Sequence, residues 1–285
     1  MVTLPGLEAR SKGWRMADIV LTAGVRQNLL QLQKTSDLIT STQTRLATGK
    51  RVNSALDNPI NYFTAQGLSN RASDLGNLLD SMSNGINTIQ TAGNGISSLT
   101  KLVQSAQALV SQAQQTADTA VRASLATQFD AIRTQIDTLS ADAGFNGINL
   151  LGGNNLTVTL NETGTSSVTV SGVTFNSAGL GIAAQVNSWA TDPDIAAASA
   201  NLTAALITLR SQSQAFSTNL STVQIRQEFT KAMINTLQTG ADNLTLADAN
   251  EEGANMLALQ TRQQLSTTAL SLASQASQSV LRLFG

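Results

Sequence analysis

The sequence contains no histidine and no cysteine among its 285 residues. Without histidine, the chain lacks the commonest general base, the commonest metal ligand and the side chain that titrates near neutral pH. Without cysteine, it cannot form a disulfide or a thiolate nucleophile, and most zinc sites are excluded. Ser-His-Asp and Cys-His triads are therefore impossible, and the fold must be stable without covalent cross-links.

Charged and aromatic residues are also scarce. Charged residues make up 12% of the chain and aromatic residues 4%, whereas soluble proteins usually contain roughly 25% charged residues. The net charge of −1 provides no basic surface for a nucleic acid. So few aromatic rings argue against a compact, aromatic-rich core, although the hydrophobic content of 41% is normal for a folded protein.

The first residues resemble neither a signal peptide nor a membrane span. Residues 1–15 contain Pro5, two glycines and four charged residues, and no long apolar run. An apolar segment is required both for secretion by a cleaved signal and for crossing a bilayer. We expect residues 1–15 to be a disordered N-terminal extension, because the patterned sequence begins at about Met16.

The last thirty residues predict a long amphipathic helix. Residues 254–284 contain neither proline nor glycine, so nothing interrupts a helix there. Apolar side chains recur at steps of three and four, which places them on one stripe: Leu265, Ala269, Leu272, Ala276, Val280 and Leu283. With only Arg262 and Arg282 charged, a helix this apolar needs a partner.

The first patterned segment offers that partner. It has apolar residues at the same four-three steps, namely Val25, Leu29, Leu32, Ile39 and Leu46, with Ser36 and Gln43 in the gaps. Two such stripes at opposite ends of the chain favour a coiled-coil pairing of the two ends. The alternative is that each helix packs separately on a globular core, which is the commoner origin of such a stripe.

Long helices are predicted between the two ends. The four-three step continues over residues 68–110, 125–143 and 202–244. A helix of about fifty residues would be roughly 75 Å long, which argues for a rod rather than an ordinary globular domain. Gly93 and Gly95 lie inside the first of these helices and predict either a bend or a close helix crossing.

The boundaries of these helices carry specific signals. Gly49 is typical of a helix C-terminus, and Asn58-Pro59 is typical of a helix start with Asn58 as the cap. The segment between them, residues 49–58, is predicted to be a linker. A second interruption is predicted at residues 245–252, where Asp248 can cap the last helix.

One short region changes from helical to strand periodicity. Leu156, Val158 and Leu160 alternate with polar residues, which predicts a strand and a hairpin within residues 152–182. The predicted fold is mainly α, with long antiparallel helical rods or a coiled coil and a small β-hairpin tip. The predicted segments are 1–15, 16–48, 49–58, 59–151, 152–192, 193–244 and 245–285.

Two patterns resemble functional sites. Gly179-x-Gly181-x-x-Ala184 matches a dinucleotide-binding fingerprint, but no strand–helix–strand unit surrounds it, so we interpret it as a turn. Asp248, Glu251 and Glu252 could act as acid–base carboxylates, but their spacing favours a helix cap or a salt bridge. We therefore expect no enzymatic activity, no metal and no cofactor.

Four segments, in their order along the chain, resemble bacterial flagellins. RLATGKRVNSALDNP at residues 45–59 resembles the family's signature between its inner and outer domains, and GINLL at residues 147–151 resembles the turn that closes the outer-domain helices. ANMLALQ at residues 254–260 and QASQSVL at residues 275–281 resemble the C-terminal signature. The resemblance covers nearly everything from Met16 to Gly285, in a short form that lacks a large surface domain.

The resemblance implies a structural subunit of the flagellar filament. Flagellins are exported unfolded through the flagellar secretion apparatus and polymerise outside the cell, so the expected partners are further copies of the chain. A filament cap, junction proteins and an export chaperone at the C-terminal helix are also implied, whereas nucleic acid and membrane are not. Residues 16–48 and 254–284 would line the inner tube, and residues 59–151 and 193–244 the outer tube.

The same resemblance suggests which residues would carry assembly. The apolar stripes of the two ends are the predicted assembly interface, namely Val25, Leu29, Leu32, Ile39, Leu46, Leu265, Leu272, Val280 and Leu283. The predicted inter-domain linker contains Gly49, Arg51, Asn53, Asp57 and Pro59. A hook–filament junction protein of the same family is the alternative, and a chemoreceptor signalling rod is a more distant one.

Overall fold

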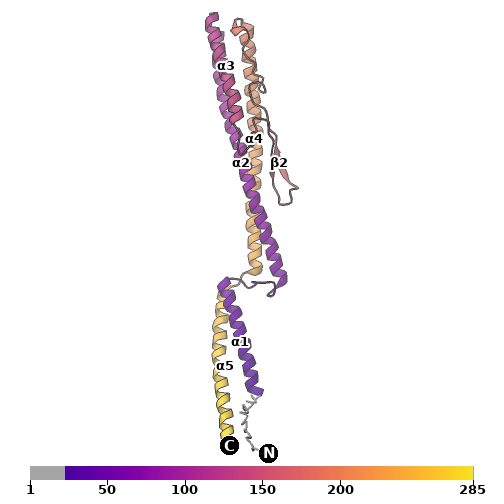
Figure 1. Ribbon diagram of the computed structural model, residues 1–285, viewed down its shortest axis with the longest axis vertical. Helices are drawn as coiled ribbons and strands as arrows, with labels where there is room; N and C mark the ends of the chain where they lie inside the picture. Colours follow the sequence, from indigo (N-terminus) through magenta and orange to yellow (C-terminus); the bar gives the residue numbers. More distant parts are fainter. Residues whose placement is uncertain (1–22, 285) are drawn as a thin grey trace, which may run out of the picture. The chain divides into compact units, whose positions relative to one another are not determined.

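The computed structural model describes residues 23–284, apart from the side chains of Ser277 and of residues 280–284. Figure 1 shows its elements, which are α1 (Ala23–Thr48), α2 (Pro59–Gln114), α3 (Thr119–Asp142), β1 (Leu156–Thr159), β2 (Ser167–Val170), the short 3-10 helix η1 (Asn187–Trp189), α4 (Asp192–Thr245) and α5 (Ala249–Phe284). The predicted fold class, long helices with one small hairpin, is confirmed.

The described chain divides into two compact units. Residues 64–242 form the central unit, which contains most of α2 and α4 together with α3 and the hairpin. The described residues up to Phe63 and from Asn243 onward form the terminal unit, which contains α1 and α5.

The central unit is built on a seven-residue repeat. α2 buries Met82, Ile89, Ile96, Val103 and Val110, and α4 buries Ile195, Leu202, Leu209, Phe216 and Val223. A strict seven-residue spacing is the signature of helices that pack side by side as a coiled coil. α3 adds Leu125, Phe129 and Ile136 to the same core, so the predicted four-three pattern is confirmed on all three helices.

One of the two predicted glycines of α2 marks a close approach, made by the segment that follows α3 and not by a crossing helix. A Cβ atom added at Gly95 would lie 2.7 Å from Leu151 Cδ1 and 3.1 Å from Ala143 Cβ. Gly93 has no such neighbour within 4 Å. The close approach therefore depends on Gly95 alone, and α2 is continuous through both positions.

The hairpin lies against α2. Its strands β1 and β2 pair in antiparallel register, with Leu156 opposite Val170. Val158 points at Gly85 of α2, where an added Cβ atom would lie 2.6 Å from Val158 Cγ2. Beyond the end of β1, Arg71 Nε of α2 is 2.5 Å from Glu162 Oε1. The predicted hairpin is thus confirmed, and it is anchored on α2 at both of these points.

The helix boundaries follow the predicted caps. Asn58 Oδ1 accepts a hydrogen bond from the backbone N–H of Asn61 at 3.0 Å, and α2 begins at Pro59. Asp248 Oδ1 accepts from the N–H groups of Asn250 and Glu251 at 2.8 and 3.3 Å, and α5 begins at once.

The second interruption is shorter than predicted. Only residues 246–248 are non-helical where residues 245–252 were expected to be so, because the Asp248 cap lets α5 start immediately. The predicted extension, residues 1–15, and the start of the first helix lie outside the described residues.

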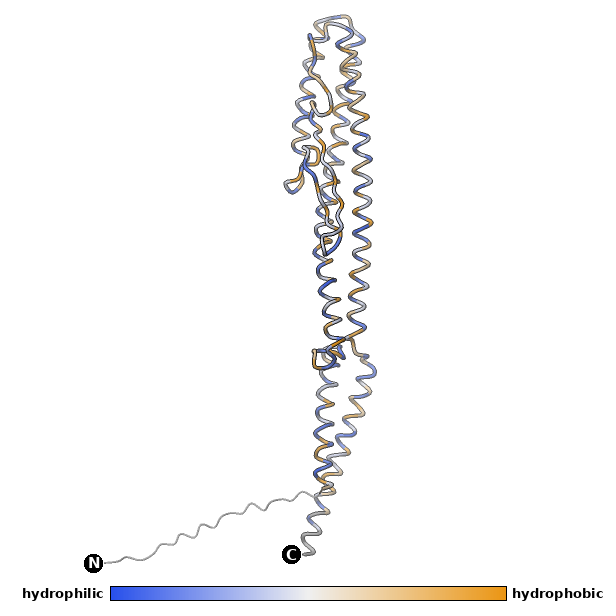
Figure 2. The backbone as a smooth tube through the Cα atoms, turned by 90° about the vertical axis from the view of Figure 1, so that its right-hand side faces the viewer, coloured by the Kyte–Doolittle hydropathy of each residue, from blue (hydrophilic) through white to orange (hydrophobic). Residues whose placement is uncertain are grey.

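Hydropathy alternates along the chain rather than gathering in long runs. Figure 2 shows apolar and polar residues interspersed along the described helices. Of the helices that the structure describes, none is both long and apolar enough to cross a membrane.

Candidate assembly surface

α1 and α5 lie side by side and antiparallel (Figure 1). On each helix, one row of positions is less exposed than the rest, and we call these two rows the terminal seam. On α1 the row is Val25, Asn28, Leu32, Thr35, Ile39 and Thr42. On α5 the row is Glu252, Met256, Leu259, Gln263, Ser266, Leu270 and Ala273. Both rows follow steps of three and four, as in a coiled coil.

About half of the terminal seam is polar. Asn28 and Gln263 are only half-buried, whereas Thr35 and Thr42 are buried. Thr35 satisfies its hydroxyl within its own helix, since Oγ1 donates to the Gln31 carbonyl at 2.8 Å. Such a seam buries less apolar surface than the central unit, because several of its positions contribute hydroxyl or amide groups.

The polar positions of the α1 row lie one residue earlier in the sequence than predicted. Ser36 and Gln43 are exposed, so the prediction that they fill the gaps is wrong, and Thr35 and Thr42 fill them instead. Threonine fits better because its methyl group packs in the seam while its hydroxyl bonds to the preceding turn.

Among the predicted α1 interface residues, the seam contains Val25, Leu32 and Ile39. Leu29 and Leu46 lie outside the seam and are 40% and 39% exposed.

α5 carries a second apolar row that faces away from α1. Leu257, Leu265 and Leu272 are 67%, 66% and 61% exposed, and Ala269 and Ala276 are exposed between and beyond them. We call these five residues the outer stripe. At about 100° per residue, the outer stripe lies roughly opposite the seam.

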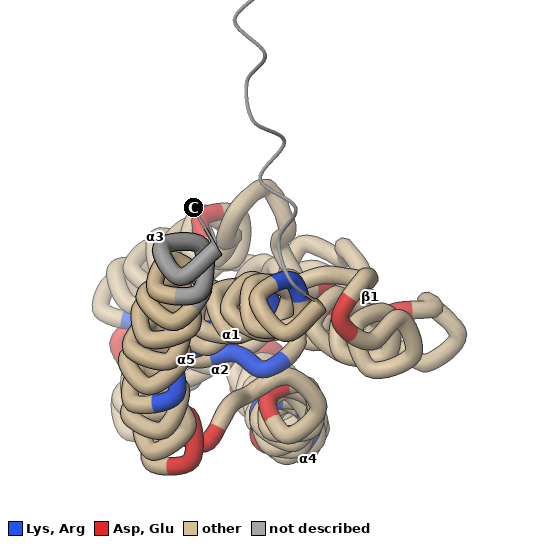
Figure 3. Tube along the Cα trace, turned by 90° about the horizontal axis from the view of Figure 1, so that it is seen from below, with Lys and Arg blue, Asp and Glu red and all other residues tan. Residues whose placement is uncertain are grey.

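The outer stripe therefore contains the predicted interface residues Leu265 and Leu272. The side chains of Val280 and Leu283, which were predicted to continue it, lie outside the described residues. Between Gly253 and Ala276, Arg262 is the single charged residue of α5, and it lies beside the stripe, one turn before Leu265. Most of α5 carries no charge, as the colouring of Figure 3 shows.

One ion pair fixes the register of α1 against α5. Arg45 Nη1 lies 3.0 Å from Glu252 Oε1, and the Glu252 side chain is only 8% exposed. The other carboxylate oxygen, Oε2, is buried without a hydrogen-bond partner among the described residues. Glu252 therefore depends on Arg45 for its stabilisation, and the predicted salt-bridge role of the acidic cluster is confirmed.

Next to this ion pair, backbone hydrogen bonds join residues 49–51, after α1, to residues 245–247, between α4 and α5. Lys50 and Leu246 form an antiparallel bridge, Arg51 N–H donates to the Thr245 carbonyl at 2.7 Å, and Ala247 N–H donates to the Gly49 carbonyl at 3.0 Å. Gly49 has φ = +67°, which glycine adopts without strain at a helix C-terminus. Gly49 and Arg51, both predicted linker residues, thus connect the ends of α1 and α4.

The rest of the predicted linker is arranged around Asp57. Its Oδ2 accepts from the backbone N–H groups of Ser54 and Asn53 at 2.9 and 3.0 Å, and from Ser54 Oγ at 3.2 Å. The backbone hydrogen bond from Ser54, followed by that from Asn53, lowers the pKa of Asp57 below its ordinary value of 3.8. Asn53 Nδ2 in turn donates to the Lys50 carbonyl at 2.9 Å. Pro59 begins α2 directly after this turn.

The glycine pattern that resembled a nucleotide site does not form one. Gly179 and Gly181 lie in a turn, with Gly181 at φ = +71°, and no helix begins there. Asn176 Oδ1 accepts from Gly179 N–H at 2.7 Å, and Arg133 Nε donates to the Ile182 carbonyl at 3.0 Å. The turn interpretation is therefore correct.

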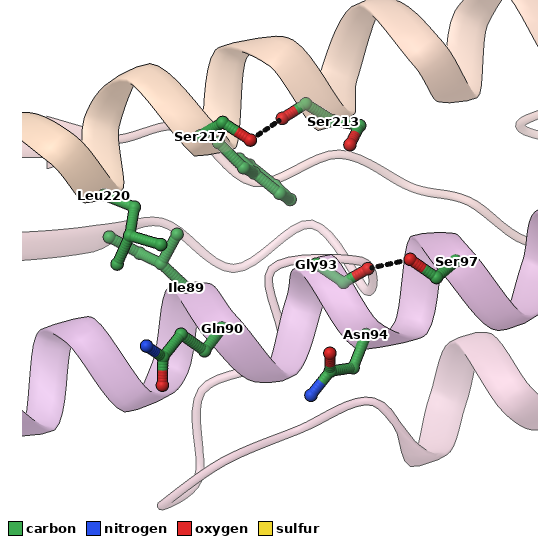
Figure 4. Close-up of a pocket in the computed structure, with 9 residues that line it drawn as sticks. Ile89, Gln90, Gly93, Asn94, Ser97, Ser213, Ser217 and Leu220 are labelled. Atoms are coloured by element: carbon green, nitrogen blue, oxygen red, sulfur yellow. Dashed lines mark hydrogen bonds between the residues drawn. The ribbon is translucent and has the colours of Figure 1, made fainter.

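One groove of the central unit is lined without any ionisable side chain. This groove, of about 430 Å³ between α2 and α4, is lined by polar residues such as Gln90, Asn94 and Ser213, as Figure 4 shows. No group of three or more metal-ligating side chains gathers anywhere in the described residues.

Comparisons with known proteins match both ends of the chain to one protein family. A family model described as the bacterial flagellin N-terminal helical region matches residues 22–156, and the corresponding C-terminal helical region matches residues 219–284. Flagellin FljK of Caulobacter vibrioides is 31% identical over 265 residues, which cover 92% of this chain and 96% of that protein.

Two further relatives span nearly the whole chain. Flagellin FljM of Caulobacter vibrioides is 32% identical over 259 residues, covering 90% of this chain and 94% of that protein. A flagellin of Brucella melitensis is 26% identical over 282 residues, covering 94% and 99%.

Removing the partner of Glu252 should loosen the terminal seam. We expect Arg45→Met to destabilise the pairing of α1 with α5 by about 1–3 kcal/mol, because it leaves a buried carboxylate unpaired. The double variant Arg45→Met with Glu252→Met should recover most of this loss. Amide exchange along α5 measures the effect, and equal exchange rates in the wild type and Arg45→Met would show that the ion pair is dispensable.

Acid should loosen the linker. A carboxylate with a lowered folded-state pKa stabilises the fold fully above its unfolded pKa and loses that contribution as the pH falls through the folded value. We expect the turn at residues 53–57 to weaken as the pH falls below about 3.8, and Asp57→Ala, which removes the acceptor oxygen, to weaken it already at pH 7. Exchange of the Asn53 and Ser54 amides measures this. A turn that is equally protected at pH 7 and pH 2 would contradict it.

Proposed function

The chain belongs to the bacterial flagellin family, and from that premise we propose that the outer stripe of α5 is a surface through which copies of the chain assemble. Flagellins are structural proteins that form the extracellular flagellar filament, and the chain is a subunit of that filament. Nothing favours the alternative of a junction protein, because the relatives that span most of the chain are named as flagellins.

The observation that carries the proposal is the exposure of three leucines on one helix. Leu257, Leu265 and Leu272 are each more than 60% exposed, although burying one leucine side chain fully stabilises a protein by about 1.5–3 kcal/mol. A contiguous apolar row that faces water marks a contact with another molecule. The partner is a second copy, since the family polymerises.

This arrangement supports different roles for the two units in the filament. In the proposal, the terminal unit, with residues 16–48 and 245–285, forms the inner tube, in which each outer stripe meets neighbouring copies. Residues 59–151 and 193–244 form the outer tube. The hairpin region, residues 152–192, takes the place of a large surface domain.

The other partners follow from the same exposed row. A subunit that waits for export with Leu265 and Leu272 uncovered is prone to aggregate, which favours a chaperone that covers α5. A filament cap and junction proteins are proposed for the two ends of the polymer, where the outer stripe has no neighbouring copy. No catalytic role is proposed for the chain.

The proposal predicts a specific assembly defect. Leu265→Ser with Leu272→Ser should leave the monomer folded, because both side chains face water, but should raise the critical concentration for polymerisation at least about a hundredfold. The matched control is Gln264→Ser with Gln275→Ser, which changes two exposed positions of α5 outside the stripe.

Seeded polymerisation followed by sedimentation and electron microscopy measures the critical concentration. If the leucine variant elongates at the concentration that suffices for the control, the outer stripe is not an assembly surface. If the unchanged chain forms no filaments under any condition, the proposed function itself fails.

A further inference from the structure

A ridge of apolar side chains stands on the outside of α4 in the central unit. Ile225 and Phe229 are one helical turn apart and 63% and 56% exposed. Arg226 and Glu228 are exposed beside them. At about 100° per residue these two charges project on opposite flanks of the ridge. We call these four residues the α4 ridge, which is positive on one side and negative on the other.

A groove with matching features lies between α2 and α3. Its volume is about 530 Å³, and its floor contains the half-buried side chains of Leu102 and Leu139. Lys101 is exposed on the α2 wall, and Asp142 is exposed on the α3 wall. The α2–α3 groove therefore has an apolar floor with one basic and one acidic wall, the complement of the α4 ridge.

Among the described residues, the four charges of these two surfaces, Lys101, Asp142, Arg226 and Glu228, have no salt-bridge partner. Charges are sparse in this sequence, at 12% of residues. Two oppositely charged pairs that flank two apolar surfaces are therefore a distinctive feature rather than a general property of the surface.

The ridge and the groove lie at different levels of the central unit. Gln227 follows Arg226 in the sequence but is half-buried on the inner side of α4, where its Nε2 donates to Ser83 Oγ of α2 at 2.9 Å, so the ridge is level with Ser83. The groove contains Lys101 of the same helix α2. The eighteen residues from Ser83 to Lys101 correspond to roughly 27 Å along α2. The two surfaces are thus separate patches, displaced along one rigid helix.

We propose that the α4 ridge of one copy docks in the α2–α3 groove of a second copy. Ile225 and Phe229 lie on the Leu102–Leu139 floor, Arg226 faces Asp142 of the second copy, and Glu228 faces its Lys101. This inference rests on the proposed function in one respect, namely that copies of the chain assemble. It adds a contact made by the central unit, independent of the outer stripe.

Such a contact is heterologous, because two different patches meet. Heterologous contacts with a displacement along the axis do not close into a ring and instead propagate as an open helical row. The ridge can lie along the groove in two opposite orientations. In only one of them does Arg226 face Asp142 and Glu228 face Lys101, so these charges determine the orientation of one subunit relative to the next. The contact supplies both the stagger and the polarity that a helical filament requires.

Charge reversal tests the contact without touching the core. The groove variant is Lys101→Glu with Asp142→Lys, and the ridge variant is Arg226→Glu with Glu228→Lys. Both keep the net charge, as does the control Asp74→Lys with Lys231→Glu, which changes exposed charges outside the two patches. The full chain is polymerised on seeds of the same variant, and the elongation rate is measured.

The expected results distinguish the contact from a general effect of charge. Each reversal should slow elongation about tenfold or more, the control should elongate like the wild type, and the variant that combines both reversals should return to within about threefold of the wild type. Thermal unfolding should be the same in all variants, because all of these side chains are exposed.

Two outcomes would overturn the inference. One is that the single-surface reversals elongate like the control, and the other is that the combined variant is as slow as the slower of its two parents. In either case the proposed function stands if Leu265→Ser with Leu272→Ser still blocks assembly. Rescue by the combined variant together with normal assembly of the leucine variant would instead support the ridge and refute the outer stripe.

Discussion

Helix α5 has two apolar faces but, among the described helices, packs along one partner, α1. Its seam face packs on α1, held in register by the pair of Arg45 with Glu252. Its outer stripe faces water. Pairing with α1 cannot cover both faces, because a single neighbouring helix contacts only one side of a helix. In our proposal, further copies of the chain bury the second face, and this face of one helix carries the assembly.

The two units of the chain differ in how completely they bury their own apolar side chains. The central unit buries a seven-residue repeat on both α2 and α4, and positions such as Met82 and Leu209 are completely covered. The terminal seam instead alternates apolar residues with threonine, serine and glutamine. The central unit therefore buries its own core more completely than the terminal unit does, and in our proposal further copies of the chain cover the terminal unit. A subunit built this way can be stable as a monomer and still assemble cooperatively.

Much of the fold could be predicted from the sequence, because the signals are local. The seven-residue repeats, the cap at Asn58, the helix stop at Gly49 and the period-two alternation in the hairpin each depend on residues near one another in the chain. The close approach at Gly95 could not be predicted in detail, since its neighbours Ala143 and Leu151 belong to a distant, non-helical segment.

The assembly surface was harder to predict, because α5 contains two apolar rows. The row at Leu265 and Leu272 has the more prominent side chains, and nothing local shows that it faces away from α1. The register is chosen by Glu252, whose partner Arg45 is 207 residues away in sequence. A second four-three row through Met256, Leu259 and Leu270 is visible in the sequence and would have indicated that the helix has two faces.

The central claim is that the outer stripe is uncovered in the monomer and covered in the filament. The chain has no cysteine, so Leu265→Cys creates a single thiol on the stripe, with a side chain that remains small and apolar. Its rate of reaction with a water-soluble thiol reagent can be compared between monomer and filament. Burial by neighbouring copies predicts a fast reaction in the monomer and a rate at least about tenfold lower in the filament. Equal rates in the two states would contradict the account.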